Sequence, residues 1–269
     1  MNDIVCPISQ KPMEPIFAET ILNKYLITYY YCEESGLLKT ETPYWLDEAY
    51  ISPIAKTDTG ILQRNIYNSL FLEILLDNLF KGDGKFLDIS GGYGILARLM
   101  RDKGFDFYTT DKYCPNIFAS NFEPEIGFNA DALCAFEVLE HIENPKLFLS
   151  NALEEFNCRT LIFSTETFLN DRIPDKNWQY YSFETGQHIT FYQPRTLQLL
   201  ANSLQLSYYM INSSMHLITD LEPPKILRYI ISKYKLLKIL SLCFEFKFPN
   251  KSKTLDDHIY ISKGLKKNR

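Results

Sequence analysis

One apolar run in this sequence ends in a cluster of glycines and leads directly into a helical pattern. Residues 85–90 (KFLDIS) are typical of a buried strand, and Gly91, Gly92 and Gly94 follow them. Residues 95–100 (ILARLM) then show the apolar spacing of a helix. Glycines permit a sharp turn and let a ligand approach the backbone, because they lack a Cβ. The segment therefore predicts a strand, a ligand-holding turn and a helix.

Strand and helix patterns alternate through the middle of the chain. We expect further strands at 105–110, 130–136, 160–164 and 207–211, and helices at 65–80, 145–155 and 194–203. Alternation at this spacing implies βαβ units and a mainly parallel sheet. The expected fold class is α/β, with its main domain over residues 61–212.

The flanking segments differ in pattern from this domain. Residues 1–60 predict an N-terminal appendage of small strands, one of them over 25–31. Residues 213–269 predict a basic amphipathic helix over 223–244, inserted before a final strand at 257–262. We expect the helix to pack on its own domain or on a twin subunit, which leaves a homodimer open. The alternative is peripheral contact with an anionic membrane.

Composition excludes some classes of protein. A net charge of −5 and a pI near 5.5 argue against general nucleic-acid binding, which needs clustered Lys and Arg. The chain has no uncharged apolar run of the length that a transmembrane helix needs. The six cysteines are scattered, form no C-x-x-C pair and follow no secretory signal, so we expect a reduced, cytoplasmic compartment.

Two motifs give the chain a family resemblance. The turn Asp88-Ile-Ser-Gly-Gly-Tyr-Gly94 and the segment Glu137-Val-Leu-Glu-His141 resemble the first motif (D-x-G-x-G-x-G) and a later strand end (E-V-L-E-H) of class I S-adenosylmethionine-dependent methyltransferases. The likeness runs from about Gly60 to Tyr209, with Ser90 in place of the first glycine. It implies a Rossmann-like methyltransferase fold with an antiparallel last strand, and S-adenosylmethionine as the cofactor.

The resemblance also assigns cofactor contacts. Asp111 would bind the ribose hydroxyls, Asn121 and Phe122 would lie by the adenine, and Arg64 would pair with the cofactor carboxylate. The remaining contacts would come from the glycine turn and from the border of the methionine part, namely Asp88, Ser90, Gly91, Gly92, Gly94, Phe136 and Glu137.

Structural roles stay open for several of these residues. Asp88 would cap the following helix, Asp111 would be a solvated acid and Phe122 would be a core residue. A nicotinamide dehydrogenase is the competing enzyme class, since residues 92–97 also fit G-x-G-x-x-A.

Two histidines are the candidate catalytic residues. His141 and His188 follow predicted strands, and either is suited to act as the general base for an acceptor hydroxyl. Alternatively, Glu137, Glu140 and both histidines would bind a divalent metal, since E-x-x-E-H resembles the metal site of some RNA-terminal and quinone-precursor O-methyltransferases. A third interpretation is structural support of the cofactor loop. We assign no metal at this point.

The acceptor is expected to contact residues 165–192, where aromatic and polar side chains interleave. Aromatic planes with polar partners suit sugar rings or flat acceptors, although a satellite apolar cluster is the alternative. Residues 178–200, above all Gly186-Gln-His-Ile-Thr-Phe-Tyr192, resemble methyltransferases found with surface-polysaccharide biosynthesis enzymes. The expected function is O-methylation of a sugar, sugar nucleotide or glycan intermediate. The alternatives are a small aromatic or quinone-type acceptor, or a non-catalytic cofactor-binding accessory protein.

The N-terminal appendage resembles a degenerate zinc ribbon. Cys6-Pro-Ile-Ser9 and Cys32-Glu-Glu-Ser35 stand where related methyltransferases have two C-x-x-C knuckles, with each second cysteine replaced by serine. Two thiolates do not complete the four-ligand site of structural zinc, so a metal-free ribbon is expected. The alternative is a pair of unrelated buried cysteines.

Overall fold

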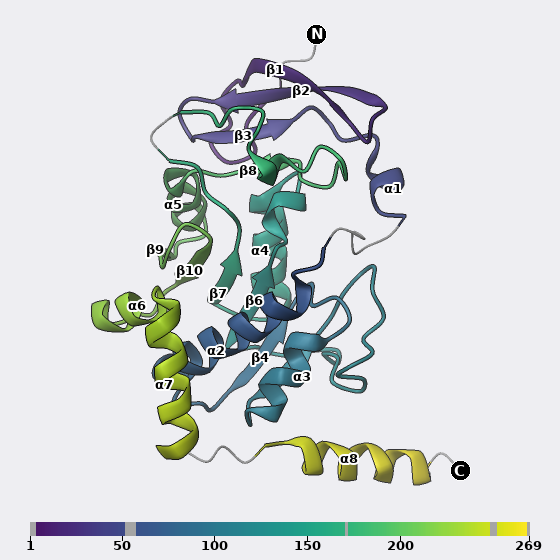
Figure 1. The fold of residues 1–269 in the computed structure, drawn as a ribbon, viewed down its shortest axis with the longest axis vertical. Coiled ribbons are helices and arrows are strands. Elements are labelled where there is room, and N and C mark those ends of the chain that lie inside the picture. The colour runs from purple at the N-terminus through teal and green to yellow at the C-terminus, as the bar shows by residue number, and fades with distance from the viewer. Residues whose placement is uncertain (1–3, 52–57, 170–171, 248–251, 268–269) are drawn as a thin grey trace. The chain divides into compact units, whose positions relative to one another are not determined.

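The computed structural model describes residues 4–51, 58–169, 172–247 and 252–267 (Figure 1). For residues 243–247 and 265–267 it describes the backbone alone. By their contacts, the residues fall into two units. Unit 1 comprises residues 1–57, 135–155 and 159–220, and unit 2 comprises 58–134, 156–158 and 221–269. Each unit is described by itself below.

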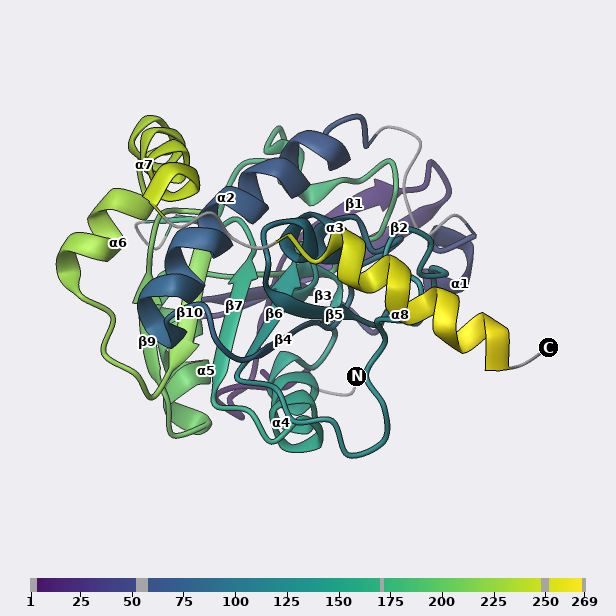
Figure 2. The same ribbon diagram turned by 90° about the horizontal axis from the view of Figure 1, so that it is seen from below.

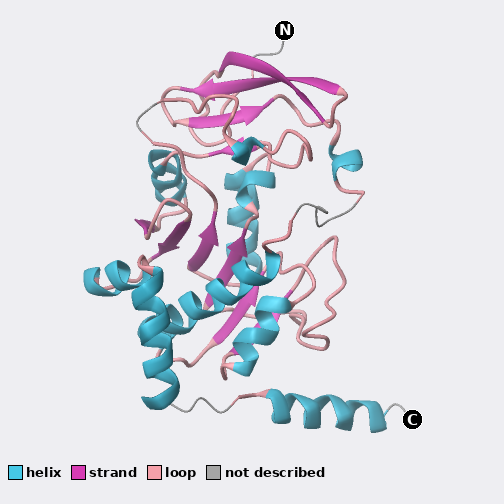
Figure 3. Ribbon diagram, in the orientation of Figure 1, coloured by secondary structure: helices cyan, strands magenta, loops and turns pink. Residues whose placement is uncertain are grey.

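A four-stranded antiparallel sheet lies in unit 1 (Figure 3). Its strand order is β1-β2-β3-β8, and the bounds are Glu14–Ile21, Tyr25–Cys32, Leu37–Thr40 and Thr190–Phe191. The strand expected at 25–31 is therefore confirmed. The pairing of Leu38 with Phe191 joins the predicted appendage to a segment far along the chain, and the sequence pattern does not predict β8.

The other sheet has six strands in the order β5-β4-β6-β7-β10-β9. Strand β4 (Lys85–Asp88) runs parallel to β5 (Asp106–Thr109) and β6 (Ala132–Phe136). Strand β10 (Met215–Thr219) runs antiparallel to β7 (Thr160–Ser164) and β9 (Ser207–Met210). The expected strands are confirmed, and so is the antiparallel last strand. That strand is β10, however, and not the segment at 257–262.

The predicted helices of the central region are also present. Unit 2 contains α2 (Ile61–Phe80) and α3 (Ile95–Asp102), and unit 1 contains α4 (Pro145–Glu155) and α5 (Pro194–Ser203). Helix α5 begins with a proline and a capping box formed by Gln193 and Thr196, which satisfies the first free backbone amides. Shorter helices are α1 (Leu46–Ala49), η1 (Leu139–His141) and η2 (Gln179–Tyr181).

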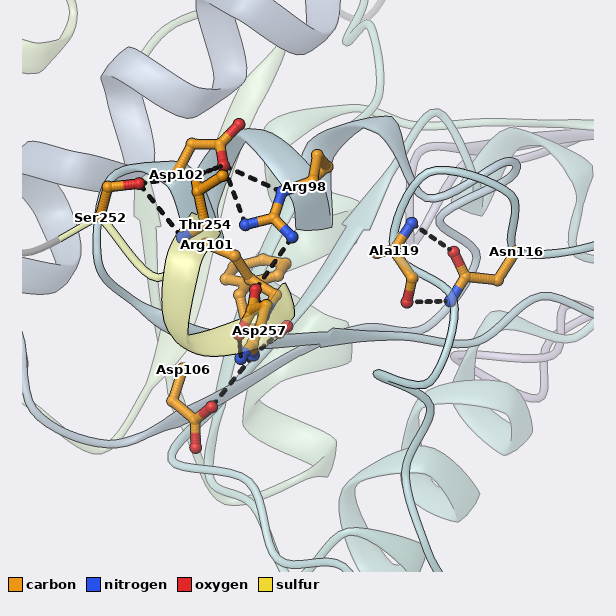
Figure 4. Close-up of polar contacts among 10 residues, drawn as sticks. Arg98, Arg101, Asp102, Asp106, Asn116, Ala119, Ser252, Thr254 and Asp257 are labelled. Atoms are coloured by element: carbon orange, nitrogen blue, oxygen red, sulfur yellow. Dashed lines mark hydrogen bonds and ion pairs between the residues drawn. The ribbon is translucent and has the colours of Figure 1, made fainter. Parts of the chain in front are cut away.

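The C-terminal segment departs from the prediction. The single helix expected over 223–244 is two helices, α6 (Lys225–Ile231) and α7 (Tyr234–Lys247), separated by Ser232 and Lys233. The strand expected at 257–262 is wrong, because these residues belong to helix α8 (Thr254–Lys267). The consecutive Ile259, Tyr260 and Ile261 have high β-propensity, but contacts of Asp257 with Arg101 anchor the segment as a helix (Figure 4).

The two Cys-Ser pairs of the N-terminal segment meet in unit 1. The Cys6 thiol lies 3.2 Å from the Ser35 hydroxyl, and the Ser9 hydroxyl lies 3.3 Å from the Cys32 thiol. The two cysteines are therefore part of one cluster rather than unrelated, although a ribbon fold stays a prediction. The five cysteines with described side chains are free thiols.

Candidate functional site

The glycine turn after β4 has the backbone geometry that glycine permits. Gly92 and Gly94 have φ angles of +56° and +83°, in the left-handed region. A Cβ on Gly91 would lie 2.1 Å from the Thr109 hydroxyl, and one on Gly94 would lie 2.2 Å from Asn116 Oδ1. A Cβ on Gly92 would meet nothing within 4 Å. Protein atoms therefore crowd the turn at Gly91 and Gly94 and leave it open at Gly92. An open backbone at Gly92 would let a ligand approach the turn.

Asp88 ends β4 in a buried position with one oxygen unpaired. Its side chain is 4% exposed, and Oδ1 has no hydrogen-bond partner. Burial raises the pKa of Asp88 to about 7, the Ser90 amide opposes this rise, and the charge of Asp111 adds to it. Helix α3 begins at Gly94 without a side-chain cap, so capping that helix is not the role of Asp88.

Asp111 ties the glycine turn to the loop that follows β5. Its carboxylate accepts hydrogen bonds from the backbone amides of Gly92 (2.9 Å), Tyr113 (2.7 Å) and Cys114 (2.8 Å). It is therefore not a merely solvated acid. Because a carboxylate can accept about four hydrogen bonds, Asp111 keeps capacity for a ribose hydroxyl.

Phe122 and Asn116 lie in the loop expected near the adenine. Phe122 is 5% exposed, and the Arg101 guanidinium lies over its ring at 3.6 Å from the centroid. The Phe122 side chain therefore packs in the core. Asn121 precedes it with a φ of +74°. Asn116 Oδ1 accepts the Ala119 amide at 3.0 Å, and its Nδ2 donates to the Ala119 carbonyl at 2.6 Å (Figure 4). Sequence reasoning missed Asn116, although an Asn directly after Pro115 is typical of a turn.

Arg64 lies on α2 and is paired with an acid. Its guanidinium donates to Asp58 at 2.6 Å, in a pair whose side chains are 43% and 23% exposed. Binding of a cofactor carboxylate by Arg64 would have to exchange this partner, and the role stays a prediction.

In unit 1, the end of β6 holds a strained residue. Glu137, directly after the half-buried Phe136, has a φ of +56°, which is unfavourable for a residue with a side chain. The Glu137 amide donates to the Ser164 hydroxyl at 2.8 Å, and that hydroxyl donates to the Glu137 carboxylate at 2.5 Å. The strain is thus held by a reciprocal contact with the end of β7.

The structure brings His141 and His188 together. Their ring centroids are 4.9 Å apart. Nδ1 of His141 lies 3.0 Å from the Gln187 carbonyl, and Nδ1 of His188 lies 2.6 Å from the Tyr180 carbonyl. A carbonyl only accepts, so each Nδ1 carries the proton and each Nε2 keeps a free lone pair. Burial lowers the pKa of His141 to about 4 and that of His188 to about 3, so both rings are neutral.

Glu140 completes this cluster. Its side chain is fully buried, and neither carboxylate oxygen has a hydrogen-bond partner of good geometry, although the nearby Tyr180 and Thr165 hydroxyls act to lower its pKa. Burial, with a smaller effect of Glu137, raises the pKa of Glu140 to about 8. Single ligand atoms of Glu140, His141 and His188 all lie within 4.8 Å of one another. An unpaired carboxylate and two imidazoles oriented by backbone carbonyls fit a divalent cation.

Residues from distant parts of unit 1 support the cluster. The Gln187 side chain donates to the Ala49 carbonyl at 2.8 Å, and the Trp45 indole donates to the Gly186 carbonyl at 2.8 Å. The Tyr180 hydroxyl lies 3.1 Å from the Thr165 hydroxyl. The N-terminal segment 44–50 therefore holds the loop that carries His188, and sequence reasoning gave it no definite role.

The aromatic segment expected to contact the acceptor is mostly core. Tyr181 and Tyr192 are 1% and 0% exposed, so the satellite-cluster interpretation holds for them. Trp178 is half-buried, and its indole donates to the Glu166 carboxylate at 3.3 Å. The Tyr180 ring lies beside it and 4.7 Å from the ring of His188. Trp178 and Tyr180 thus connect the partly exposed aromatic residues to the histidine cluster.

Comparison with known proteins identifies the class. A family described as "Methyltransferase domain" matches residues 62–209, more than half of the 269-residue chain. The chain therefore belongs to this family, and it is a class I methyltransferase that uses S-adenosylmethionine. The family match favours a methyltransferase over the competing nicotinamide dehydrogenase. Comparison with curated sequences finds no match.

Solved structures show distant likeness. A methyltransferase of calicheamicin biosynthesis is 13% identical with a TM-score of 0.43, over 65% of this chain and 60% of that one. The plantazolicin methyltransferase BpumL is 11% identical with a TM-score of 0.46, over 65% and 91%. Magnesium protoporphyrin IX methyltransferase from Synechocystis PCC 6803 is 12% identical with a TM-score of 0.41, over 65% and 94%. The chain spans 60% of the calicheamicin enzyme's length, and the family match alone carries the assignment.

Proposed function

We propose that the protein methylates a hydroxyl oxygen, and that its acceptor is a sugar, a sugar nucleotide or a glycan intermediate. The observation that carries this proposal is the pair of neutral histidines with free Nε2 atoms beside a buried, unpaired Glu140. Methyl transfer to a hydroxyl requires removal of the hydroxyl proton, and neutral imidazole accepts a proton at Nε2. The fixed Nδ1–H tautomers leave Nε2 as the accepting atom in both rings.

The residues of the glycine turn have the cofactor role. When bound, S-adenosylmethionine would supply a sulfonium methyl group that is transferred in line to the acceptor oxygen, with S-adenosylhomocysteine as the leaving group. Gly92 presents an open backbone to the cofactor, and Asp111 holds the turn while its remaining acceptor capacity binds the ribose hydroxyls. Asp88 supports the turn from the end of β4.

A metal-assisted form of the same reaction is the second candidate, and the unpaired carboxylate of Glu140 favours it. An imidazole with a pKa of about 3 or 4 is a weak base at neutral pH. A divalent cation held by Glu140, His141 and His188 would lower the pKa of a hydroxyl that it binds. Glu137 is next to this group and is held by Ser164, so it would contribute only after that contact is exchanged.

The half-exposed pair of Trp178 and Glu166 favours a sugar acceptor over a flat phenol. An aromatic ring beside a carboxylate offers an apolar face to a sugar ring and an acceptor for its hydroxyl groups. A phenol or quinone precursor would require more exposed aromatic surface than Tyr181 and Tyr192 provide.

The test is formation of S-adenosylhomocysteine with sugar-nucleotide, glycan and phenolic acceptors, with and without chelator. We expect turnover with a sugar-based acceptor and a decrease of about 100-fold or more for His188→Asn, at unchanged cofactor affinity. His258→Asn, which changes an exposed histidine on α8, is the matched control. Full turnover of His188→Asn would exclude both the base and the ligand role of His188, and turnover restricted to phenols would refute the sugar assignment.

Binding of Mn²⁺ tests the metal form separately. Calorimetric titration of the cofactor-free protein should show one Mn²⁺ site that is lost in Glu140→Gln and kept in His258→Asn. Absence of Mn²⁺ binding together with chelator-resistant turnover would leave the histidine base as the mechanism.

A further inference from the structure

Helices α6 and α7 lie in a segment whose charged side chains up to residue 244 are all positive. Residues 223–244 contain five basic residues and no acidic one, although the whole chain has a net charge of −5. The basic residues are Lys225, Arg228, Lys233, Lys235 and Lys238. A solvated helix that serves only packing usually mixes both signs of charge on its outer face. The segment therefore has a charge pattern that packing does not explain.

One face of the helix pair is firmly attached within unit 2. Leu227, Ile231 and Leu237 are 5%, 0% and 0% exposed, and both helices contact α2 (Figure 2). The Ser241 hydroxyl donates at 2.6 Å to the buried carboxylate of Glu73, which also pairs with Lys103. The helices are thus folded and anchored without any further partner.

A second set of apolar side chains points away from that face. The exposed fractions are 66% for Ile226, 60% for Tyr229, 58% for Ile239 and 51% for Leu242, whereas the ring of Tyr234 lies 5.6 Å from that of Tyr67 on α2. These residues interleave in sequence with the lysines. Exposed aliphatic and aromatic side chains among basic residues are typical of helices that lie in a membrane interface. The packing interpretation explains the inner face only.

We propose that α6 and α7 dock the protein onto an anionic lipid surface. The basic side chains attract the anionic headgroups, and the exposed Ile, Leu and Tyr side chains enter the boundary between headgroups and acyl chains. The rest of the chain is net acidic and is repelled by the same surface, so the helix pair is the part that faces the membrane. Among the residues that the structure describes, no helix is long and apolar enough to cross a bilayer. Docking is peripheral, and it does not depend on the proposed acceptor.

Vesicle flotation with the full chain tests this proposal without any methyl transfer. The probes are vesicles of phosphatidylcholine alone and of phosphatidylcholine with phosphatidylglycerol in equal parts. We expect binding to the anionic vesicles only, weakened by salt, and reduced at least about tenfold in Lys235→Glu/Lys238→Glu. Lys112→Glu/Lys263→Glu changes two exposed lysines outside the helix pair and makes the same charge change, so it should retain binding.

A second variant tests the apolar part of the surface. Ile239→Ser/Leu242→Ser removes exposed side chains and should weaken vesicle binding while keeping the helix pair folded. Equal binding to both vesicle types, absence of binding, or equal losses in the two lysine variants would overturn the proposal. A different result would show that the surface joins two copies of the chain. In that case the unaltered chain would be a dimer that does not bind vesicles, and Ile239→Ser/Leu242→Ser would convert it to a monomer.

Discussion

Two buried carboxyl groups, Asp88 and Glu140, have oxygens without hydrogen-bond partners. Buried polar atoms in folded proteins are almost always paired, and unpaired ones mark sites that a ligand or ion completes. With pKa values of about 7 and about 8, Asp88 is about half protonated and Glu140 mostly protonated at pH 7 in the absence of a cation. Both residues follow or end strands of the six-stranded sheet, where α/β proteins bind ligands.

The raised pKa of Glu140 predicts a pH-dependent stability. The unfolded carboxyl group ionises near 4.5, whereas the folded one keeps its proton to about 8, so the unfolding free energy falls as pH rises across this interval. Between pH 7 and 8, Asp88 has passed its folded pKa of about 7 and both histidines are neutral. Urea unfolding in the presence of a chelator should therefore show that the unfolding free energy falls by up to about 1.4 kcal/mol per pH unit.

Glu140→Gln provides the comparison for this pH dependence. The unfolding free energy of the variant should depend much less on pH from 7 to 8, because glutamine does not ionise and only the remaining titration of Asp88 contributes. Added Mn²⁺ should reverse the trend in the unaltered chain, since metal binding requires the ionised carboxylate. An identical slope in both proteins would contradict the assigned pKa of Glu140.

The variant Asp111→Asn tests the proposed contact of Asp111 with the cofactor ribose. Asparagine keeps one oxygen for the Tyr113 and Cys114 amides and loses the oxygen that accepts from Gly92. A charged hydrogen bond contributes about 1.5–3 kcal/mol, so cofactor affinity should fall by about one to two orders of magnitude. Calorimetric titration measures this change, and unaltered affinity would remove Asp111 from the cofactor site.

The geometry of the glycine turn predicts that a side chain at position 91 would disturb it. A Cβ at this position would collide with the Thr109 hydroxyl at 2.1 Å, and Thr109 is buried in β5. Gly91→Ala should therefore displace the turn, lower stability by about 1–3 kcal/mol and weaken cofactor binding. In Gly127→Ala, the added Cβ meets nothing within 4 Å, so only backbone strain should remain and cofactor affinity should be kept. Equal cofactor affinity in both variants would contradict the close approach described for the turn.

Helix α8 makes a prediction about its anchor on α3. Asp257 binds Arg101 with two hydrogen bonds of 2.8 and 2.6 Å, and the two side chains are 6% and 5% exposed (Figure 4). Asp257→Ala removes two hydrogen bonds from the buried Arg101 guanidinium and leaves it with Asp106 and the Phe107 carbonyl, so we expect a loss of about 2–3 kcal/mol in urea unfolding. Asp220→Ala breaks the exposed pair with Arg159 and should cost about 1 kcal/mol or less. Similar losses in the two variants would mean that α8 is not held by this pair.

The same helix shows where sequence patterns fail. The strand, turn and helix at residues 85–102 were predictable because strand composition, glycines and helical spacing are local signals. Residues 257–262 contain a short run of high β-propensity, and the contacts with α3 that hold them as a helix come from a distant part of the chain. Strand β8 has two residues and exists through its pairing with β3, so no periodic pattern can reveal it.

Across the whole molecule, some residues of the candidate site could be predicted from local motifs and others could not. The glycines, Asp111 and the Glu137–His141 segment were found from motifs. The support of His188 by Tyr180 and Gln187, and of Gln187 by Ala49, depends on contacts between distant segments and was not predictable. The burial that makes Glu140 unpaired was likewise invisible, because a sequence shows a residue type but not its hydrogen-bond partners.

The chain is an S-adenosylmethionine-dependent methyltransferase, and we propose that its cofactor binds at the glycine turn. Calorimetric titration of the full chain with S-adenosylmethionine, S-adenosylhomocysteine and NAD tests it most directly, because no acceptor is needed. We predict one site for each adenosyl ligand, weakened in Gly91→Ala, and no binding of NAD. Binding of NAD alone, or adenosyl binding that Gly91→Ala and Asp111→Asn leave unchanged, would contradict the account.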